Sequence, residues 1–594
     1  MSLQQQVEEW LRLDQNPETR HEIEKLWSEK DTDELKLRLS SRIEFGTAGL
    51  RGRMEAGWSR MNDLTIIQAS QGLAEYVAAN VENALLKGIV VGYDHRYHSK
   101  RWAELTAGIF LHRGFKAYLY DGLVHTPLVP FAVKHLNASC GVMITASHNP
   151  KQDNGYKVYW ENAVQIIAPH DERIAKSIKA NLEPRPESWS TETVNLSESC
   201  INKSEDLKNA YFASLRSLDH LSPLSKPAQV TFVNTSMHGV SDPYVSRAFG
   251  TLGLAPFKPV AEQQHPDPEF PTVKFPNPEE KGALDLAIAT ADKENGAYIL
   301  AQDPDSDRFS AAERQSSGKW QIFTGDQLGT LFASYIIEKR KDKGQDISKI
   351  AMVASTVSSK MLETIAKIEG FKFVECLTGF KYIGNTALDL VKDGYEVPFG
   401  YEEAIGFMFG PDIRDKDGVA ATVSFVDLVS YVKAKGLSVS QYLNSLYTKY
   451  GHFKSNNGYF VCHEPAKIDE IFRRIRNFTG GEKDRSFPSS IYDIPIVGVI
   501  DLTLGYDSRN APSYEPSLPL SSGHMIQFRA GREEDPVKLI LTTRTSGTEP
   551  KIKYYLEGSG RDPVEVVRVL NAAVDELSDV WMEAKKNGLP ITRP

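Results

Sequence analysis

The sequence predicts a mixed α/β fold divided among several domains. Short apolar, β-branched runs such as Gly88-Ile-Val-Val-Gly-Tyr-Asp94 alternate with longer helical stretches along most of the chain, as in helices packed on sheets. The 594 residues correspond to about four domains at roughly 150 residues each. Hydrophobic residues make up 41% of the chain and charged residues 25%, so each domain can build a core and the chain is globular.

We expect a first domain over residues 1–210. Residues 4–40 are predicted to be helical, and Asn16 followed by Pro17 is a typical helix start. Further helices are expected over 64–80 and about 100–113, with strands at 88–94, 116–120 and 140–144. The stretch 183–205 is rich in Pro, Ser, Glu and Thr and is expected to be a solvated excursion near the boundary.

Three more domains are expected over 211–325, 326–450 and 451–594. The second begins with a strand near 228–233 and reaches a buried strand at 297–301; a helix is expected over 438–450. In the fourth, a strand covers 539–543, and a C-terminal helix begins at Asp562-Pro563 and ends near Gly588. Three successive α/β units of similar plan are expected, followed by a smaller α+β domain.

Composition excludes several function classes. The net charge is −9 and no block of Lys and Arg occurs, which argues against binding to nucleic acid or to an anionic membrane. Four separated cysteines without a C-x-x-C pair indicate neither a zinc site nor a disulfide framework, and they fit a reducing compartment. The polar N-terminus is not a signal peptide, and no apolar run approaches 18 residues, so we expect a cytoplasmic protein.

A candidate nucleophile lies in the segment Thr145-Ala-Ser-His-Asn-Pro150. An apolar strand precedes the segment, Asn154-Gly155 predicts a tight turn after it, and a strand pattern resumes at Val158. Ser147 therefore lies on a loop between strands, next to His148 and ahead of the cation Lys157, which suits a nucleophile. The alternative is that the Ser147 side chain only satisfies turn backbone.

A candidate metal site lies in Asp303-Pro-Asp305-Ser-Asp307-Arg308, directly after a predicted strand. On an extended backbone the three alternate carboxylates share one face, and a hard divalent cation such as Mg²⁺ would relieve their repulsion. An EF-hand calcium loop is excluded, because Arg308 stands where glycine is required and Arg314 where glutamate is required. A solvated acidic turn remains the alternative.

Two further loops suit anions. Phe45-Gly-Thr-Ala-Gly-Leu-Arg51-Gly52 combines a flexible backbone with a guanidinium, although such glycine-rich loops are often only turns. Arg544-Thr-Ser-Gly-Thr548 combines a guanidinium fork with hydroxyl and backbone donors, which suits phosphate, although an ordinary polar turn has a similar composition.

Together these motifs resemble the α-D-phosphohexomutases over nearly the whole chain. The Ser-His-Asn-Pro loop, the Asp-x-Asp-x-Asp-Arg loop, a Glu-Glu loop at Tyr401-Glu-Glu-Ala-Ile-Gly406 and the Arg-Thr-Ser-Gly-Thr loop occur in that order. The stretches Glu44-Phe-Gly-Thr-Ala-Gly-Leu-Arg-Gly52 and Ser59-Arg-Met-Asn-Asp-Leu-Thr-Ile-Ile-Gln68 are similar, more narrowly, to the type-2 phosphoglucomutase/phosphopentomutase branch.

The resemblance implies four domains around one cleft and a phosphoryl group carried on Ser147. It implies Mg²⁺ as cofactor, held by that phosphoryl group and the three aspartates, and a sugar bisphosphate, glucose 1,6-bisphosphate or ribose 1,5-bisphosphate, as activator. Arg51, His148 and Lys157 match positions beside the transferred group, and either His148 or Lys157 could be the general base. The implied sugar-binding residues are Arg308, Thr378, Gly379, Glu402, Ala404 and Lys416. The implied phosphate-binding residues are Arg544, Ser546, Gly547 and Thr548.

Two departures bear on substrate choice. Pro304 and Ser306 replace glycines of the glucose-preferring branch, and Ala404 replaces a serine, which removes one hydroxyl partner for the sugar. The expected activity is therefore the interconversion of ribose or deoxyribose 1-phosphate with the 5-phosphate, and of glucose 1-phosphate with glucose 6-phosphate. The alternatives are a strictly glucose-specific mutase, a glucose 1,6-bisphosphate synthase and a non-catalytic relative. We expect sugar phosphates as the only partners of a monomer or weak homodimer.

Overall fold

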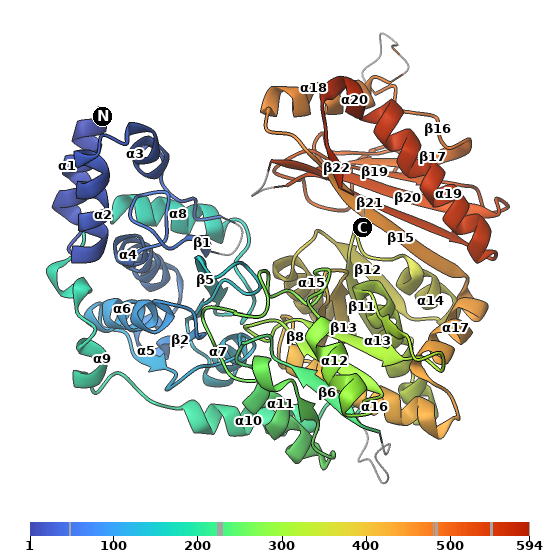
Figure 1. The fold of residues 1–594 in the computed structure, drawn as a ribbon, viewed down its shortest axis with the longest axis horizontal. Helices are drawn as coiled ribbons and strands as arrows, with labels where there is room; N and C mark the ends of the chain where they lie inside the picture. Colours follow the sequence, from blue (N-terminus) through green and yellow to red (C-terminus); the bar gives the residue numbers. More distant parts are fainter. Residues whose placement is uncertain (47–48, 222–229, 479, 481–484, 547–549, 593–594) are drawn as a thin grey trace. The chain divides into compact units, whose positions relative to one another are not determined.

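The computed structural model describes residues 1–46, 49–221, 230–478, 480, 485–546 and 550–592 (Figure 1). The chain divides into two compact units. The first comprises Met1–Ala354, Phe371–Val374 and Thr378–Val439, and the second comprises Ser355–Gly370, Glu375–Leu377 and Ser440–Pro594. In the described part of the chain, no helix is both long and apolar enough to cross a lipid bilayer.

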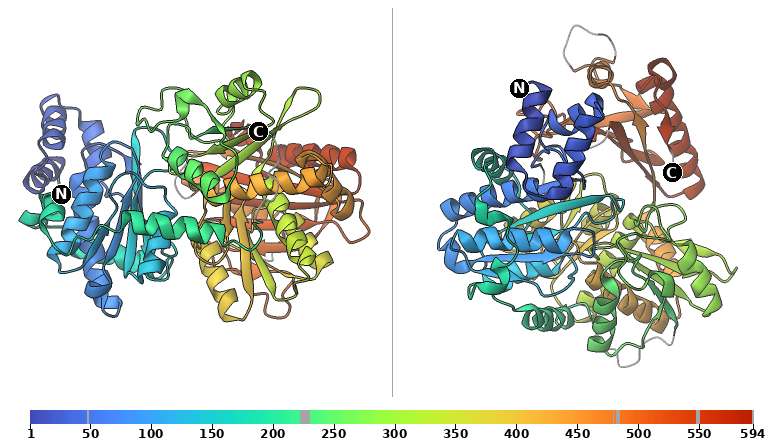
Figure 2. Two further views of the ribbon diagram at one scale, coloured as in Figure 1. Left: turned by 90° about the horizontal axis from the view of Figure 1, so that it is seen from below. Right: turned by 60° about the vertical axis from the view of Figure 1, so that its left-hand side comes forward.

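The first unit begins with a small helical bundle of α1 (Leu3–Leu13), α2 (Pro17–Ser28) and α3 (Thr32–Leu39), drawn in dark blue in Figure 2. The predicted helix start is confirmed: the side chain of Asn16 accepts a hydrogen bond from the N–H of Glu18, and Pro17 is the first helical residue. Trp10 is fully buried and packs edge-to-face on Trp58, so the bundle has its own core.

The first sheet has the strand order β1-β5-β4-β2-β3. Strands β3, β2 and β4 are parallel, whereas β5 runs antiparallel to both β4 and β1. The strands are β1 (Gly49–Arg53), β2 (Ile89–Tyr93), β3 (Ala117–Leu119), β4 (Cys140–Ile144) and β5 (Asp153–Trp160). The helices are α4 (Asp63–Asn80), α5 (Ala84–Lys87), α6 (Ser99–His112), α7 (Leu128–Leu136), α8 (His170–Ala180), η1 (Pro186–Trp189), α9 (Thr193–Leu196) and α10 (Ser204–Arg216).

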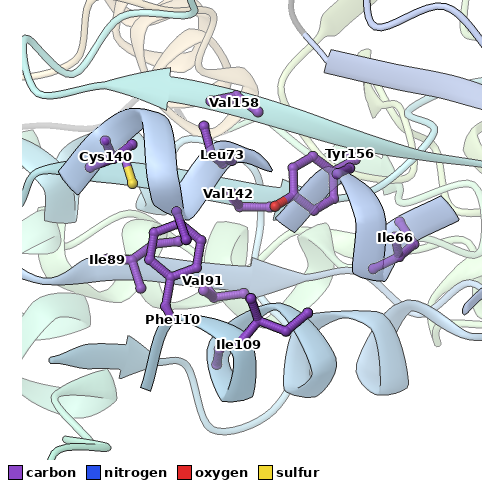
Figure 3. Packing of buried hydrophobic residues seen from close by; sticks show 14 of the residues in the cluster. Ile66, Leu73, Ile89, Val91, Ile109, Phe110, Cys140, Val142, Tyr156 and Val158 are labelled. Atoms are coloured by element: carbon purple, nitrogen blue, oxygen red, sulfur yellow. The ribbon is translucent and has the colours of Figure 1, made fainter. Parts of the chain in front are cut away.

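The core of this sheet explains why these segments fold as they do. The central strands carry apolar residues at nearly every position, because the sheet is buried on both faces. Ile66 and Leu73 from α4 and Ile109 and Phe110 from α6 pack toward side chains of β2, β4 and β5 (Figure 3). The packed strands give the β4–β5 connection rigid ends.

The second sheet repeats this plan with the order β10-β9-β8-β6-β7, in which β7, β6 and β8 are parallel and β9 is antiparallel to β8 and β10. Its strands are β6 (Phe232–Thr235), β7 (Lys258–Pro259), β8 (Tyr298–Gln302), β9 (Phe309–Arg314) and β10 (Trp320–Ile322). Its helices are α11 (Ser241–Leu252), η2 (Ala261–Gln263) and α12 (Asp285–Lys293).

The third sheet has the order β12-β11-β13-β14, with β11 parallel to β13 and β14 antiparallel to β13. Its strands are β11 (Ile350–Ser355), β12 (Lys372–Cys376), β13 (Glu396–Glu402) and β14 (Gly406–Phe409), and the helices of the first unit beside it are α13 (Gly325–Asp342), α15 (Phe380–Lys392) and α16 (Gly418–Ala434). The predicted similarity of three successive α/β units is therefore visible in their topology. In each sheet, one central strand connects directly to an antiparallel neighbour: β4 to β5, β8 to β9 and β13 to β14.

The second unit contains a larger antiparallel sheet with the order β16-β17-β19-β20-β21-β15-β22, and β18 pairs with β17. The strands are β15 (His452–Val461), β16 (Ser490–Ile491), β17 (Ile494–Asp501), β18 (Tyr506–Asp507), β19 (Met525–Ala530), β20 (Val537–Thr545), β21 (Lys551–Gly560) and β22 (Ile591–Thr592). The helices are α14 (Met361–Glu369), α17 (Val439–Tyr450), α18 (Pro465–Arg476), α19 (Pro563–Glu576) and α20 (Ala584–Asn587). Helix α19 packs along β15 and β21 (Figure 1).

The single C-terminal helix predicted from Asp562 to Gly588 is only partly correct. The start is confirmed, because the Asp562 side chain accepts hydrogen bonds from the N–H groups of the first turn. The α-helix ends at Glu576, one π-helical turn follows over Leu577–Trp581, and Glu583 has a left-handed backbone with φ of 43°. The short α20 then ends at Gly588. Trp581 is buried, and its indole N–H donates to Glu576, so packing accounts for the break.

Candidate active site

Ser147 lies in the connection from β4 to β5, as predicted. Its backbone has a left-handed φ of 55°, and its N–H donates to Oγ1 of Thr145 at 2.9 Å. The side chain is only 3% exposed. Its Oγ donates to Oδ2 of Asp303 at 2.8 Å and lies 3.3 Å from Nδ1 of His148.

The tight turn predicted at Asn154-Gly155 is wrong, because both residues lie inside β5. Gly155 pairs with Arg51 of β1, and a Cβ at residue 155 would lie 2.4 Å from the carbonyl oxygen of Thr145. The Asn154 amide donates to the Tyr97 carbonyl at 3.0 Å and to Oγ of Ser99 at 2.9 Å. Close approach of backbones, rather than a turn, accounts for the glycine.

The three aspartates lie in the connection from β8 to β9. The prediction that they share one face of an extended strand is wrong, because the segment turns. Ser306 has φ of 56°, and its N–H donates to the Asp303 carbonyl at 2.8 Å. Their convergence is nevertheless present, since one oxygen from each carboxylate lies within 4.8 Å of the others. All three side chains are buried.

Two lysines and two hydroxyl groups contact this carboxylate cluster. Lys157 Nζ lies 2.7 Å from Oδ2 of Asp305 and 2.9 Å from Oδ2 of Asp307. Thr126 Oγ1 donates to Oδ2 of Asp305 at 2.6 Å, and Lys416 Nζ lies 3.4 Å from Oδ2 of Asp307. Asp303 accepts from Ser147 through Oδ2 and from the N–H of Arg308 through Oδ1.

The cluster holds opposing pKa shifts. Burial, together with the charges of Asp305 and Asp307, raises the pKa of Asp303 well above its usual value. Burial acts in the same direction on Asp305, but the charge and hydrogen bond of Lys157 outweigh it and hold the pKa of Asp305 below its usual value. Burial alone would lower the pKa of Lys157, but the charges of Asp305 and Asp307 raise it, so the lysine stays cationic.

The donor set fits a hard divalent cation. The Oδ1 atoms of Asp305 and Asp307 are buried and have no hydrogen-bond partner among the described residues. Carboxylate oxygens are the ligands that Mg²⁺ and Ca²⁺ prefer in proteins. The buried cluster could therefore bind a metal ion through oxygens that the protein leaves unpaired.

The Glu-Glu loop lies in the third connection of the same kind, from β13 to β14, and it contacts the loop of the aspartates. Arg308 Nη2 lies 3.7 Å from Oε1 of Glu402, and Nη1 donates to the carbonyl oxygen of Ala404. A backbone bridge also joins Arg308 to Gly406. Burial raises the pKa of Glu402 despite the neighbouring cations of Arg308 and Lys416.

Thr378 and Gly379 immediately precede α15. The hydroxyl of Thr378 is buried without a hydrogen-bond partner in the part of the chain that the structure describes. Phe380, the next residue after Gly379, lies under the Lys416 ammonium, 4.9 Å from ring centroid to Nζ. The Thr378 segment therefore lies near the aspartates through Lys416, without a direct hydrogen bond to them.

Two other predicted residues contact the loop of Ser147 or its partner Asp303. Arg51, on β1, is exposed, and its Nη1 donates to Oδ1 of Asn149 at 3.2 Å. His148 Nδ1 lies 4.0 Å from Oδ2 of Asp303. Desolvation and the cations Arg308 and Arg51 lower the pKa of His148 well below its usual value, so the imidazole is neutral at pH 7.

The predicted phosphate-binding residues belong to the second unit. Arg544 is on β20, and its Nη2 donates to the hydroxyl of Tyr555 at 3.1 Å. The N–H of Ser546 donates to the Lys551 carbonyl at 2.9 Å. Gly547 and Thr548 lie outside the described residues.

Two residues of the site were missed in the sequence analysis. Thr126 binds the aspartate loop twice, through its hydroxyl to the Asp305 carboxylate and through its N–H to the Asp305 carbonyl at 2.9 Å. Arg96 donates to four carbonyls around Ser147. A position at the carboxyl end of a buried strand was the available signal for Arg96, and Thr126 carries no comparable signal.

Three family models cover most of the chain. The models of phosphoglucomutase/phosphomannomutase α/β/α domains I, II and III match residues 42–185, 209–318 and 324–450. The chain belongs to this family, the α-D-phosphohexomutases. The predicted family and fold class are thereby confirmed, including a further β-rich domain at the C-terminus.

Relatives within the phosphohexomutases match end to end. The human phosphopentomutase is 43% identical over 99% of this chain and 97% of its own length. The human glucose 1,6-bisphosphate synthase is 42% identical over 98% of this chain and 95% of its own length. Among solved structures, the exocytosis-sensitive phosphoprotein pp63/parafusin, a phosphoglucomutase from Paramecium in its open form, aligns with a TM-score of 0.67 at 17% identity, over 93% of this chain and 98% of its own.

Proposed function

We propose that this phosphohexomutase interconverts ribose or deoxyribose 1-phosphate with the 5-phosphate, and glucose 1-phosphate with glucose 6-phosphate. The observation that carries the proposal is the 2.8 Å hydrogen bond from Ser147 Oγ to Asp303, inside a carboxylate cluster that also holds Lys157. A hydroxyl in this position can carry a phosphoryl group next to a cation site. The full-length similarity to a phosphopentomutase supports the choice of substrates.

In the proposed reaction, phosphorylated Ser147 gives its phosphoryl group to a free hydroxyl of the bound sugar phosphate. The bond from phosphorus to Oγ breaks, a bond to the sugar oxygen forms, and the hydroxyl proton passes to a base. The resulting bisphosphate turns end for end, and its other phosphoryl group returns to Ser147. Free sugar bisphosphate acts as activator because it phosphorylates any enzyme that has lost this group.

The residues around Ser147 divide the electrostatic work. His148 is neutral and lies near Oγ, so it can accept the proton, whereas Lys157 is cationic while it pairs with Asp305 and Asp307. Arg51 adds positive charge beside the transferred group. Asp303, Asp305 and Asp307, with the phosphoryl group on Ser147, would hold Mg²⁺, whose charge offsets that of the transferring group.

The remaining residues are proposed to hold the sugar phosphate. The sugar would be contacted by Arg308, Thr378, Gly379, Glu402 and Lys416. Ala404 would leave room for it without adding a hydrogen bond. Arg544, Ser546, Gly547 and Thr548 would bind the non-reacting phosphate. One phosphate site can serve both orientations, because either end of the bisphosphate presents the same group.

The deciding experiment measures kcat/KM for ribose 1-phosphate and for glucose 1-phosphate, both with sugar bisphosphate activator and Mg²⁺. We expect the pentose phosphate to be turned over at least as well as glucose 1-phosphate. A preference for glucose by orders of magnitude would contradict the pentose assignment and leave the mutase assignment standing. Absence of turnover with both would contradict the mutase assignment.

The similarity to a glucose 1,6-bisphosphate synthase supports a second candidate function with the same site. A synthase transfers the phosphoryl group of an acyl phosphate to a sugar monophosphate and releases the bisphosphate. Bisphosphate formation from glucose 1-phosphate and 1,3-bisphosphoglycerate, faster than the mutase turnover, would favour this candidate.

A cytoplasmic location and a monomeric or weakly dimeric state are part of the main proposal.

A further inference from the structure

The backbone carbonyls around Ser147 converge on one guanidinium group. Arg96 follows β2 and is 3% exposed. Its Nη2 donates to the carbonyls of Ser147 and Asn149, both at 2.6 Å. Its Nη1 donates to the carbonyls of Pro150 at 2.8 Å and Asp153 at 3.1 Å. One side chain therefore fixes four carbonyls of the loop that carries the candidate nucleophile.

Arg96 is itself held by the groups behind it. Its N–H donates to Oδ1 of Asp94 at 3.0 Å, and its Nε lies 3.5 Å from Oδ2 of Asp94. Its guanidinium carbon lies 5.0 Å from the ring centroid of Phe270, a buried residue of the segment between η2 and α12. An ion pair and an aromatic ring thus restrict where the guanidinium can move.

A second, more exposed attachment joins the segment after β2 to the loop of Ser147 through Glu269. Lys151, in the nucleophile loop, lies 2.6 Å from a carboxylate oxygen of Glu269, and the Tyr97 hydroxyl donates to the other oxygen at 2.8 Å. Exposed pairs of this kind contribute little stability, so the buried Arg96 carries most of the restraint.

We propose that Arg96 is a positioning residue for phosphoryl transfer at Ser147, and this inference rests on the proposed function. A left-handed backbone is unfavourable for serine and persists only where its surroundings hold it. Arg96 contacts the carbonyl of Ser147 and not its Oγ, so it acts through the direction in which the hydroxyl points. Lysine cannot replace it, because one ammonium nitrogen cannot serve four carbonyls in a fixed fork geometry.

The test compares Arg96→Lys with the matched control Arg113→Lys, which alters an arginine of the same domain that lies 3.0 Å from Glu75. We expect Arg96→Lys to lower kcat by about 10²-fold, as misplacement of a reacting group by about 1 Å can. The KM for the sugar phosphate should stay unchanged, and Arg113→Lys should keep wild-type kcat and KM. Hydrogen exchange should quicken over residues 145–153 in Arg96→Lys and remain at the wild-type rate in other parts of the first sheet.

A second variant separates positioning from general loss of structure. Arg96→Ala removes the guanidinium group. We expect millimolar guanidinium chloride to raise the kcat of this variant at least about tenfold, because the free ion can bind the four carbonyls. Arg113→Ala should show no such response. If Arg96→Ala does not fold, the Arg96→Lys measurements decide.

The proposal is overturned if Arg96→Lys keeps wild-type kcat, or if exchange quickens throughout the sheet. Wild-type protein is assayed alongside: if it lacks phosphoryl transfer, the proposed function fails, whereas local quickening of exchange in Arg96→Lys still shows that Arg96 restrains the loop.

Discussion

At the scale of single residues, the burial of Ser147 decides how it can react. The side chain lies on a loop and yet is only 3% exposed, and its hydroxyl faces Asp303 instead of water. A phosphoryl group on this oxygen would stand against three buried carboxylates, so positive charge must be close by for the arrangement to persist. The serine and the aspartates therefore form one site.

Ser147→Ala should abolish turnover and leave the fold intact. Loss of one hydroxyl hydrogen bond is expected to lower the free energy of unfolding by no more than about 2 kcal/mol. Intact-mass spectrometry should find a phosphorylated fraction in the wild type and none in the variant. The control, Ser70→Ala, removes another buried hydroxyl and should keep both the phosphorylated fraction and turnover. Normal turnover by Ser147→Ala would exclude the covalent mechanism.

Asp305→Asn should weaken Mg²⁺ binding and lower kcat, because it removes one charge and one unpaired oxygen ligand from a hard-ion site. The loss of affinity should reach at least the roughly 10–100-fold that loss of an outer-shell partner causes. EDTA should inactivate the wild type and added Mg²⁺ should restore it, with binding followed by calorimetry. Asp292→Asn, an exposed aspartate of the same domain, serves as control. Activity indifferent to chelation would contradict the metal assignment.

Ala404→Ser should shift preference toward glucose 1-phosphate. A site that hydrogen-bonds a hydroxyl rejects analogues that lack it, and alanine offers no such bond. One regained hydrogen bond corresponds to about 1 kcal/mol in the ratio of the two kcat/KM values. Both values are measured in wild type and variant, and an unchanged ratio would exclude residue 404 as a determinant of sugar choice.

At the scale of elements, the helices and strands that depend on residues close together in the sequence were predicted correctly. The helix start at Asn16-Pro17 and the strands β2, β4 and β8 follow from local hydrogen bonding and from runs of apolar residues. The predicted turn at Asn154-Gly155 is wrong because the need for glycine there comes from the Thr145 backbone, a contact between strands. The convergence of the aspartates was predicted correctly, but the reason given was wrong: an extended segment was expected, and the chain turns there.

Residues that act across the fold could not be predicted. Arg96 lies more than fifty positions from the carbonyls it binds, and Thr126 lies 179 positions from Asp305. The position of Arg96 after a buried strand indicates a residue near a site but not which carbonyls it binds, and Thr126 has no such signal. The partners of both residues are set by the packing of the sheets. The roles assigned to the predicted site residues stay proposals that the experiments here address.

Gly155→Ala tests the crowded strand pairing directly. A methyl group at residue 155 must displace backbone atoms, so we expect the free energy of unfolding to fall by about 1–3 kcal/mol and kcat to fall with it. Gly250→Ala is the control: this exposed helical glycine has open space around it, and alanine there should stabilise by up to about 1 kcal/mol. Urea denaturation measures both, and a neutral Gly155→Ala would contradict the pairing.

At the scale of the whole molecule, three sheets of one plan contribute three chemically different loops. The β4–β5 connection carries Ser147, the β8–β9 connection carries the aspartates, and the β13–β14 connection carries Glu402. The domain limits predicted at 210, 325 and 450 stay a prediction. Matched family models begin at 209 and 324, near the first two limits, and one ends at 450.

Loading with Mg²⁺ should stabilise the first compact unit selectively, because all three aspartates belong to it. At a free concentration about 100 times Kd, the expected stabilisation is about 2.7 kcal/mol. Hydrogen exchange with Mg²⁺ and with EDTA should differ in peptides of residues 1–354 and coincide in peptides of residues 485–546. At the same Mg²⁺ concentration, Asp305→Asn should show a smaller difference in the first unit, because its Kd is raised. Protection confined to the second unit would place the metal elsewhere.

The contact between Arg308 and Ala404 has a consequence for how substrate range can evolve. Arg308 binds the carbonyl oxygen at position 404, a group that every amino acid supplies. The side chain at 404 can therefore vary while the Glu-Glu loop keeps this contact with the loop of the aspartates. A lineage could exchange one sugar for another at this position by single substitutions, with the phosphoryl-transfer machinery left untouched, and a protein engineer could randomise the same codon for the same reason.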